Sequence, residues 1–227
     1  MMKKELLSNL IAHRGMCCKD AVENTIPAFL KCIRYGYIIE LDVRLSKDRK
    51  IVVFHDSNLH RLTGISKNVE NCNYDELKKY KILNKYTIPL LSTVLNIVDG
   101  NVPIMIDIKG NIENYILEQE LLKVLGNYNG IIFIHSFFAN SLNWMRKRAK
   151  RYSYGLIVLN STHLKLFLKL WIRTRYDFIS CQLSGVKKEY LQKLRKSKQL
   201  IGWTIKSKND LNRYKLYCDN FICENIR

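Results

Sequence analysis

Hydrophobic residues gather along the chain in short runs rich in isoleucine, valine and phenylalanine, and a longer stretch of helical pattern follows most of these runs. Short apolar runs predict buried strands, and the intervening stretches predict helices. The expected strands are 9–13, 38–45, 102–108, 130–136, 154–159, 178–183, 200–206 and 221–224. The expected helices are 25–35, 91–99, 112–125, 139–150, 162–173, 187–197 and 208–217. Strands and helices therefore alternate along nearly the whole chain.

This alternation predicts an α/β fold, because helices of ~10–15 residues carry a chain from one parallel strand to the next. Eight strands favour a closed (β/α)8 barrel, the TIM barrel, which would be compact at 227 residues. No internal repeat or linker is visible, so we expect one domain over residues 1–227. The segment 47–64 breaks the alternation with a further apolar run, Ile51–Phe54. We interpret it as a small loop excursion after the second strand, on the top face of the barrel.

The composition excludes several classes of protein. With 47% hydrophobic residues, 10 Gly and 3 Pro, the chain is neither disordered nor fibrous. No apolar run approaches the ~20 residues of a membrane span, and the N-terminus lacks the features of a signal peptide. The seven cysteines include no Cys-x-x-Cys pair and resemble neither a disulfide framework nor a zinc site. We therefore expect a cytoplasmic protein with reduced thiols.

The charge is strongly positive and unevenly distributed. Of the net +18, residues 141–200 contribute 15 Lys and Arg against 2 Asp and Glu. This asymmetry points to a polyanionic partner, either nucleic acid or an anionic membrane surface. Segment 163–176 carries a narrow basic stripe on a largely apolar helix, which is typical of membrane interfaces. We expect residues 144–198 to contact anionic membranes peripherally, although a solvated basic face with a dimer contact explains the pattern equally well.

Polar residues fall where the expected strands end, and in a parallel barrel the catalytic groups lie at those ends. These residues are His13, Arg14 and Gly15 after the first strand, Glu40 and Asp42 on the second, and Asp107 and Lys109 on the third. Side chains two positions apart face the same side of a strand, so the three carboxylates converge on the barrel mouth. Buried charges of one sign need a cation, and oxygen ligands favour Mg²⁺ or Ca²⁺ over zinc. The alternative is that Glu40 pairs with a lysine and Asp42 caps a turn.

Two histidines lie in the expected top-face loops. His13 ends the first strand, and His55 follows the extra apolar run. Beside a divalent cation they form an obvious general acid and general base. We expect His135 to be a packed strand residue and His163 to be an ordinary surface residue on a helix.

Taken together, these residues form a series of motifs that spans nearly the whole chain. The motifs are HRG at 13–15, ENT at 23–25 with Ala28 and Phe29 behind it, Glu-x-Asp at 40–42, VVFHD at 52–56 followed by Leu59, Arg61 and Thr63, DIKG at 107–110, HSFF at 135–138 and GWT at 202–204. Their order resembles that of the glycerophosphodiester phosphodiesterase family, in the phospholipase C-like phosphodiesterase superfamily. The N-terminal block is the most specific part of the resemblance.

The resemblance implies a (β/α)8 barrel that hydrolyses glycerophosphodiesters to sn-glycerol 3-phosphate and an alcohol with one Mg²⁺ or Ca²⁺ ion. By motif, it implies that His13 and His55 are the catalytic residues and that Glu40, Asp42 and Asp107 bind the metal. It also implies that Arg14, Lys109 and Trp203 bind the phosphate or the rest of the substrate, and that Gly15, Glu23 and Asn24 support the site. Gly15 would let the backbone approach the ligand. Asn24 or Thr25 would cap the first helix, and Glu23 either serves there or reaches into the site.

In the mechanism that the resemblance implies, one histidine deprotonates the glycerol 2-hydroxyl, which attacks phosphorus to give a cyclic phosphate. The other histidine protonates the leaving alcohol, and water then opens the ring. Two residues depart from the family pattern: Asp107 stands where Glu is usual, and the usual Ile-Thr-Asp is Ile222-Cys223-Glu224 here. Both histidines are retained, so we expect activity.

The expected substrate is a small or lipid-derived glycerophosphodiester. An alternative with the same chemistry is a lysophospholipase D-type activity on membrane lysophospholipids. A third interpretation, from another class, is a non-catalytic barrel that binds polyanions. Nucleic acid is a disfavoured partner, because such a barrel would have no use for two histidines and three carboxylates at one mouth.

Overall fold

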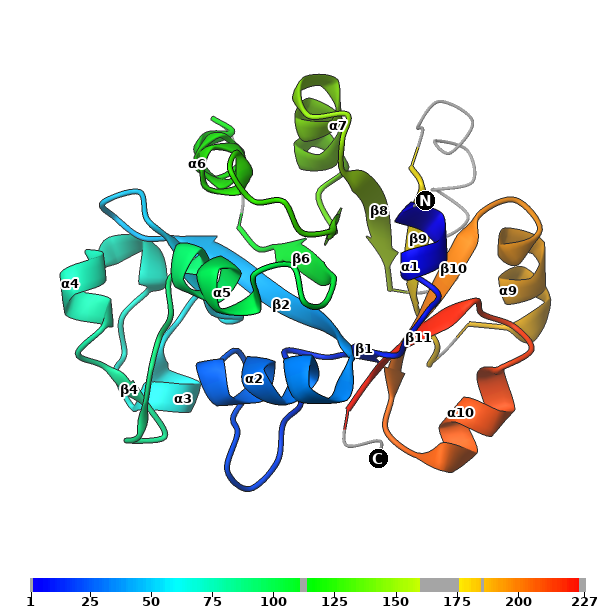
Figure 1. Ribbon diagram of the computed structural model, residues 1–227, viewed down its shortest axis with the longest axis horizontal. Helices are drawn as coiled ribbons and strands as arrows, with labels where there is room; N and C mark the ends of the chain where they lie inside the picture. The colour runs from blue at the N-terminus through cyan, green and yellow to red at the C-terminus, as the bar shows by residue number, and fades with distance from the viewer. Residues whose placement is uncertain (1, 111–113, 160–175, 185, 225–227) are drawn as a thin grey trace.

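Eight parallel strands close into a barrel (Figure 1). The computed structural model describes residues 2–110, 114–159, 176–184 and 186–224. The barrel strands, in their order around it, are β1 (Ile11–Ala12), β2 (Ile38–Leu45), β6 (Ile104–Ile108), β7 (Ile132–Ser136), β8 (Ser153–Val158), β9 (Phe178–Gln182), β10 (Gln199–Ile205) and β11 (Asn220–Cys223). Strand β1 pairs with both β11 and β2, which closes the barrel. The predicted TIM barrel is confirmed, with all eight strands where the apolar runs place them.

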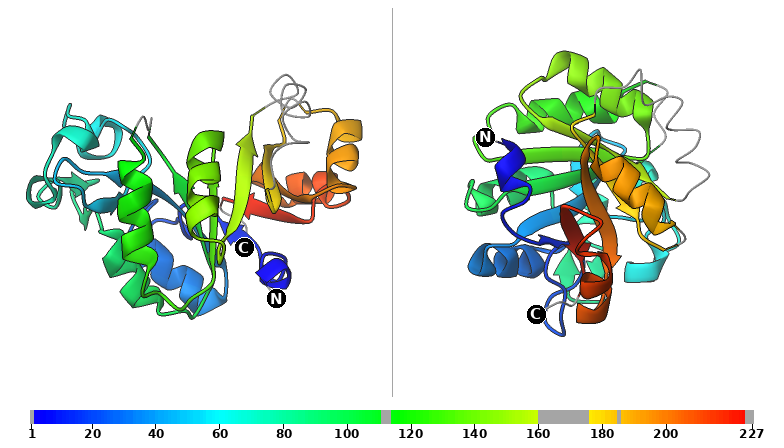
Figure 2. Two further views of the ribbon diagram at one scale, coloured as in Figure 1. Left: turned by 90° about the horizontal axis from the view of Figure 1, so that it is seen from above. Right: turned by 90° about the vertical axis from the view of Figure 1, so that its right-hand side faces the viewer.

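Helices surround the strands on the outside (Figure 2). They are α2 (Ile26–Tyr35), α5 (Leu91–Val98), α6 (Ile116–Leu125), α7 (Ala139–Arg148), α9 (Lys188–Arg195) and α10 (Lys208–Tyr214). Helix α2 shows how sequence sets such bounds. Pro27 lies in its first turn, where its missing N–H breaks no helical bond, and Gly36 ends it at φ +73°. The helix expected at 162–173 lies outside the described residues.

The excursion after β2 is more structured than the predicted loop. Strand β3 (Ile51–Val53) pairs antiparallel with the end of β2. It is followed by α3 (His60–Thr63), the 3-10 helix η1 (Val69–Asn71), α4 (Tyr74–Leu77), β4 (Lys81–Ile82) and β5 (Tyr86–Thr87). These elements gather at one end of the molecule (Figure 1), and their apolar residues, including Phe54, Leu59 and Leu77, bury one another in a separate cluster. Such short elements carry too little periodicity to be read from sequence.

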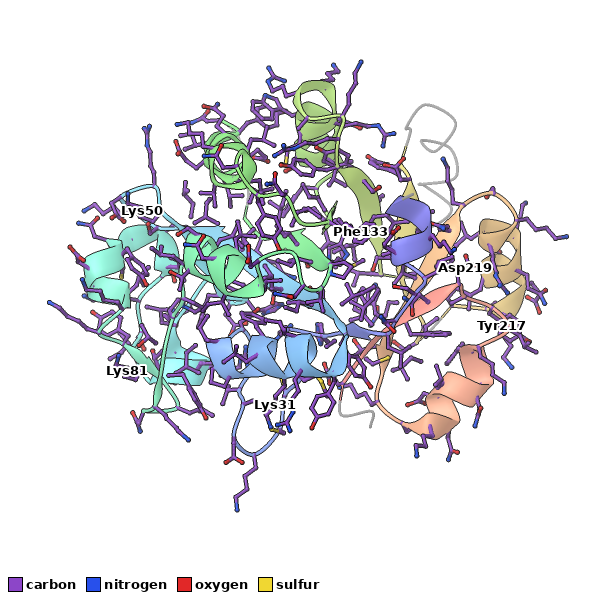
Figure 3. All side chains as sticks on the ribbon, viewed as in Figure 1. Lys31, Lys50, Lys81, Phe133, Tyr217 and Asp219 are labelled. Carbon is purple, nitrogen blue, oxygen red and sulfur yellow. The ribbon has the colours of Figure 1, made fainter. Side chains whose placement is uncertain are left out.

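A layer of apolar side chains fills the lower part of the barrel. Its members are Leu6, Ile11, Ile38, Met105, Phe133, Phe178, Ile201 and Ile222. Phe133 lies deep among the strands, whereas Lys50 and Lys81 project from the rim of the excursion (Figure 3). Leu6 comes from the segment after α1 (Met2–Glu5), a helix too short to predict, and is only 1% exposed. The side-chain amide of Asn220 donates to the carbonyls of Leu6 and Asn9, which holds this segment against the barrel.

Candidate active site

A polar layer lies directly above the apolar one, because barrel-facing side chains recur at every second residue of a strand. Two positions after the apolar residues of β1, β2, β6, β7, β10 and β11 come His13, Glu40, Asp107, His135, Trp203 and Glu224. A cavity of about 160 Å³ lies at this level. It is lined by His13, Arg14, Glu40, His55, Asp107, Lys109, His135, Phe137, Ile157, Ser180, Trp203 and Ile222. The strand ends thus bring most of the predicted site residues together.

His13 is fixed by the last strand of the barrel. Its backbone N–H donates to the carbonyl of Cys223 at 3.0 Å, and its Nδ1 lies 2.5 Å from Oε1 of Glu224. The hydrogen bond to His13 lowers the pKa of Glu224 to about 2. The sequence alone marks Glu224 only as a departure from the family pattern. The structure makes it the carboxylate that orients His13.

His55 is held in the same way by a different carboxylate. The strand β3 carries it to the barrel mouth, where Arg44 Nε donates to its backbone carbonyl at 2.8 Å. Its Nδ1 lies 2.6 Å from Oδ1 of Asp56, and Arg61 Nε donates to the other oxygen of Asp56. Each catalytic candidate is therefore a histidine oriented through Nδ1 by a carboxylate.

The two histidines differ in the direction of their pKa shifts. Burial tends to lower the pKa of His13, but the Glu224 hydrogen bond and the charge of Glu40 raise it above its ordinary value. Burial lowers the pKa of His55, and this outweighs the opposing effects of Asp42 and Asp56. Titratable pairs displaced in opposite directions are typical of an acid and a base that work together.

Arg14 is anchored by acidic groups on three sides. Its Nη1 donates to Oε1 of Glu23 at 2.7 Å, and Arg61 donates to the same carboxylate. Its Nε lies 3.2 Å from Oδ2 of Asp42, and its backbone N–H donates to Oε2 of Glu40. Glu23 therefore caps no helix; it reaches into the site and positions the guanidinium.

Asn24 and Thr25 do not cap helix α2 with their side chains, so that prediction is wrong. The Asn24 amide donates to Oδ2 of Asp42 at 2.8 Å, and its carbonyl oxygen accepts from the Asp42 backbone N–H. Thr25 occupies the N-cap position, but its hydroxyl donates to the Val22 carbonyl. Asn24 binds Asp42 instead of the helix, because the carboxylate of Asp42 is only 1% exposed and needs hydrogen-bond donors from the protein.

Lys109 bridges two of the three buried carboxylates. Its Nζ lies 2.6 Å from Oδ2 of Asp107 and 3.2 Å from Oδ1 of Asp42. Despite burial, Lys109 and Arg14 hold the pKa of Asp42 well below its usual range. Burial raises the pKa of Asp107 to about 6, although Lys109 opposes this shift. Asp42 is thus fully paired within the protein, and Asp107 only on one oxygen.

The three buried carboxylates meet at the mouth in two groups: Asp42 and Asp107 share Lys109, and Glu40 and Asp107 lie beside His135. Among the described residues, the group whose donor atoms could share a cation is Glu40, Asp107 and His135, with these atoms within 4.8 Å of one another. Asp42 is instead paired with cationic side chains. Oδ1 of Asp107 and both ring nitrogens of His135 are buried without a hydrogen-bond partner. Orphaned polar atoms of this kind fit a bound cation. His135 is packed in its strand as predicted, and it also borders this group of donor atoms; its position two residues after Phe133 is the signal that could have placed it there.

Trp203 lines the cavity as the resemblance implies, in edge contact with the ring of Phe137 at 6.3 Å. Gly15 does not line it. At φ +85°, a Cβ on Gly15 would come 2.8 Å from the Cβ of Ala28 on helix α2. Close packing of the loop on α2 therefore explains this glycine. Gly15 also lines a second cavity of about 560 Å³ beside His13 and Glu224, and its expected role in ligand approach stays a prediction.

The fold and the site define a TIM-barrel protein whose mouth joins two carboxylate-oriented histidines to an arginine and a lysine, an arrangement suited to phosphate ester chemistry. The chain belongs to the glycerophosphoryl diester phosphodiesterase family, whose sequence profile matches residues 13–201.

Named relatives and solved structures agree with this membership. A glycerophosphodiester phosphodiesterase of Caldanaerobacter subterraneus is 32% identical over 90% of this chain and 88% of its own. Human lysophospholipase D is 36% identical, over 56% of this chain and 44% of its own. The Thermotoga maritima glycerophosphodiester phosphodiesterase superposes with a TM-score of 0.78 at 26% identity, over 95% of this chain and 94% of its own. An Oleispira antarctica phosphodiesterase, solved with the product sn-glycerol-3-phosphate, superposes with a TM-score of 0.84 at 20% identity, over 97% of this chain and 94% of its own.

Proposed function

We propose that this protein is a metal-dependent glycerophosphodiester phosphodiesterase, which hydrolyses its substrate to sn-glycerol 3-phosphate and an alcohol. The observation that carries the proposal is the pair His13 and His55, each oriented through Nδ1 by a carboxylate, in one cavity with Arg14 and Lys109. The names of the relatives support it, since the bacterial relative that matches most of the chain is named for this activity.

The cationic side chains bind the phosphate. Arg14 is locked in place by Glu23, and Lys109 is held at the centre of the mouth by Asp107. Their charges stabilise the negative charge that grows on the nonbridging oxygens in the transition state. The rings of Trp203 and Phe137 line the same cavity and offer an apolar wall to the carbon atoms of the substrate.

The two histidines carry the protons. His55, whose lowered pKa favours the neutral form, accepts the proton of the glycerol 2-hydroxyl, and this oxygen attacks phosphorus. His13, whose raised pKa favours the protonated form, donates its proton to the leaving alcohol oxygen as the phosphorus–oxygen bond breaks. In the second step the neutral His13 takes a proton from water, which opens the cyclic phosphate, and His55 returns its proton to the 2-oxygen.

Glu40 and Asp107 would hold a divalent cation, because each presents an oxygen to the same point of the cavity. Bound there, the cation would supply Lewis-acid stabilisation of phosphate charge. Oxygen ligands alone admit Mg²⁺ or Ca²⁺. Asp42, which the resemblance also places on the metal, contributes here by holding Arg14 and Lys109 in position.

We also propose that the chain acts as a single domain in the cytoplasm on small or lipid-derived substrates, with peripheral membrane contact through 144–198. The uneven charge supports that contact, although the segment 163–176 at its centre lies largely outside the described residues. Across the described part of the chain, no helix is long and apolar enough to cross a bilayer. Failure to bind anionic vesicles at low salt would contradict the membrane contact.

The test is release of sn-glycerol 3-phosphate from glycerophosphocholine and glycerophosphoglycerol by the purified protein. We expect activity that chelation removes and that added divalent ion restores. His13→Ala and His55→Ala should each lower kcat by about 10² to 10⁴. His60→Ala, which removes an exposed histidine on α3, is the matched control and should retain full activity. Activity that survives both chelation and His13→Ala would contradict the proposal.

The same assay with lysophosphatidylcholine as the substrate distinguishes the proposed activity from the lysophospholipase D alternative. The human and mouse relatives of that name match 56% and 61% of this chain, whereas the bacterial glycerophosphodiester phosphodiesterase matches 90%. We therefore expect the small glycerophosphodiesters to be the better substrates. Preferential cleavage of the lysolipid would instead favour the alternative.

A further inference from the structure

His135 lies at the centre of the barrel without a satisfied ring nitrogen. It is 2% exposed, and neither Nδ1 nor Nε2 has a hydrogen-bond partner. Its Nε2 lies 3.6 Å from Oε1 of Glu40, which is outside hydrogen-bonding distance. A neutral imidazole needs one donor and one acceptor, and a charged one needs two acceptors. The long contact with Glu40 satisfies neither protonation state fully.

Two carboxylates face His135, one with an unpartnered oxygen and one with an oxygen at ion-pair distance from its ring. Oδ1 of Asp107 is also buried and unpartnered, while its Oδ2 binds Lys109. Oε2 of Glu40 accepts from the Arg14 backbone, which leaves Oε1 on the side of His135. One cation could take one oxygen of each carboxylate and one ring nitrogen together, since these atoms lie within 4.8 Å of one another.

The three residues come from three adjacent strands, so their positions are set by the barrel. Asp107 on β6 lies opposite His135 on β7 in the register, and β6 also pairs with β2, which carries Glu40. The hydroxyl of Ser136 donates to the Ile108 carbonyl, which further ties β7 to β6. A ligand set built on neighbouring strands is preorganised, because no loop has to move to form it.

We propose that His135 supplies a nitrogen ligand to the divalent cation of the site, and that it gives the site a preference for first-row transition ions such as Mn²⁺ over Ca²⁺. This deepens the proposed function and rests on its metal dependence. Imidazole favours transition ions, whereas Ca²⁺ takes oxygen ligands.

The test measures metal binding directly. Dissociation constants for Mn²⁺ and Ca²⁺ are measured by calorimetry on the metal-free full-length protein, and Mn²⁺ is also observed by pulsed electron paramagnetic resonance, which detects a coordinated nitrogen. We expect tighter binding of Mn²⁺ and a nitrogen coupling. His135→Gln keeps a buried polar group but offers oxygen, so we expect it to lose the coupling and to weaken Mn²⁺ binding about tenfold or more, with a much smaller effect on Ca²⁺.

His135→Ala, checked for folding by circular dichroism, should lose the same coupling, and His60→Ala should retain it. An unchanged coupling and unchanged Mn²⁺ affinity in both His135 variants would overturn the inference, as would tighter binding of Ca²⁺ than of Mn²⁺ by the wild type. Hydrolysis measured in parallel keeps the two claims apart. Nitrogen ligation without hydrolysis would support the inference and contradict the proposed function. Hydrolysis without nitrogen ligation would support the proposed function and overturn the inference.

Discussion

Glu224 carries one of the two hydrogen bonds that orient the proposed catalytic histidines. It accepts from His13 at 2.5 Å, and its other oxygen lies 3.1 Å from Nζ of Lys206. An imidazole tied to a carboxylate holds its proton more tightly, so this bond favours the acid form of His13 that the proposed mechanism uses. The pKa of His55 is lowered although Asp56 also binds its ring, because the effect of burial on this pKa is larger than the effect of the carboxylate.

These opposed shifts predict a bell-shaped dependence of kcat/KM on pH. At low pH, activity falls as His55 becomes protonated, and the midpoint of this limb should lie below the ordinary pKa of histidine. At high pH, activity falls as His13 loses its proton, and the midpoint of this limb should lie above the ordinary pKa of histidine. Glu224→Gln removes the carboxylate that raises the pKa of His13, so the alkaline limb should move to lower pH. Glu224→Asp retains the charge and should leave the limb closer to its original place. An alkaline limb that does not move in Glu224→Gln would show that His13 is not the acid.

At the scale of elements, the loop between β1 and α2 depends on close packing at Gly15. A Cβ there would lie 2.8 Å from the Cβ of Ala28 and 3.1 Å from its backbone carbon. Gly36, at the end of α2, has a similar positive φ but open space around it. Substitution of Gly36 therefore measures the destabilisation caused by backbone strain alone, whereas substitution of Gly15 adds the destabilisation caused by a steric clash.

Gly15→Ala should destabilise the protein by about 1–3 kcal/mol more than Gly36→Ala, because only Gly15→Ala adds overpacking to the strain of positive φ. The free energy of unfolding in urea measures both. Gly15→Ala should also lower activity, since it displaces the neighbouring His13 and Arg14. Equal destabilisation by the two substitutions would contradict the packing role.

The elements that sequence could predict are those set by local pattern. Eight apolar runs give eight strands, and strand ends give His13, Glu40 and Asp107 their place at the mouth. The contact between His13 and Glu224 joins residues 211 positions apart, so no local pattern reveals it. The pairing of Asn24 with Asp42 is likewise missed, because a helix cap and a buried carboxylate compete for the same side chain and only the folded barrel decides between them.

For the whole molecule, the lower end of the barrel is closed by the segment around Leu6. This side chain completes the apolar layer beneath the active site, far from the chemistry. Leu6→Ala should destabilise the protein by about 2–5 kcal/mol, as truncation of a buried leucine does, with little change in kcat. The neighbouring Leu7 is 41% exposed, so Leu7→Ala is the control and should cost much less. Thermal or urea unfolding of the two variants gives the comparison, and equal stability would argue against the closing role of this segment.

We propose that the barrel mouth cleaves glycerophosphodiesters at the phosphorus–oxygen bond of the leaving alcohol. Phosphorus NMR of glycerophosphocholine, incubated with the protein and a divalent ion in ¹⁸O-enriched water, follows the bond that breaks. We predict sn-glycerol 3-phosphate with one ¹⁸O on phosphorus and unlabelled choline, because water opens a cyclic phosphate in the last step. Labelled choline, phosphocholine as the product, or no turnover with any divalent ion would contradict the account.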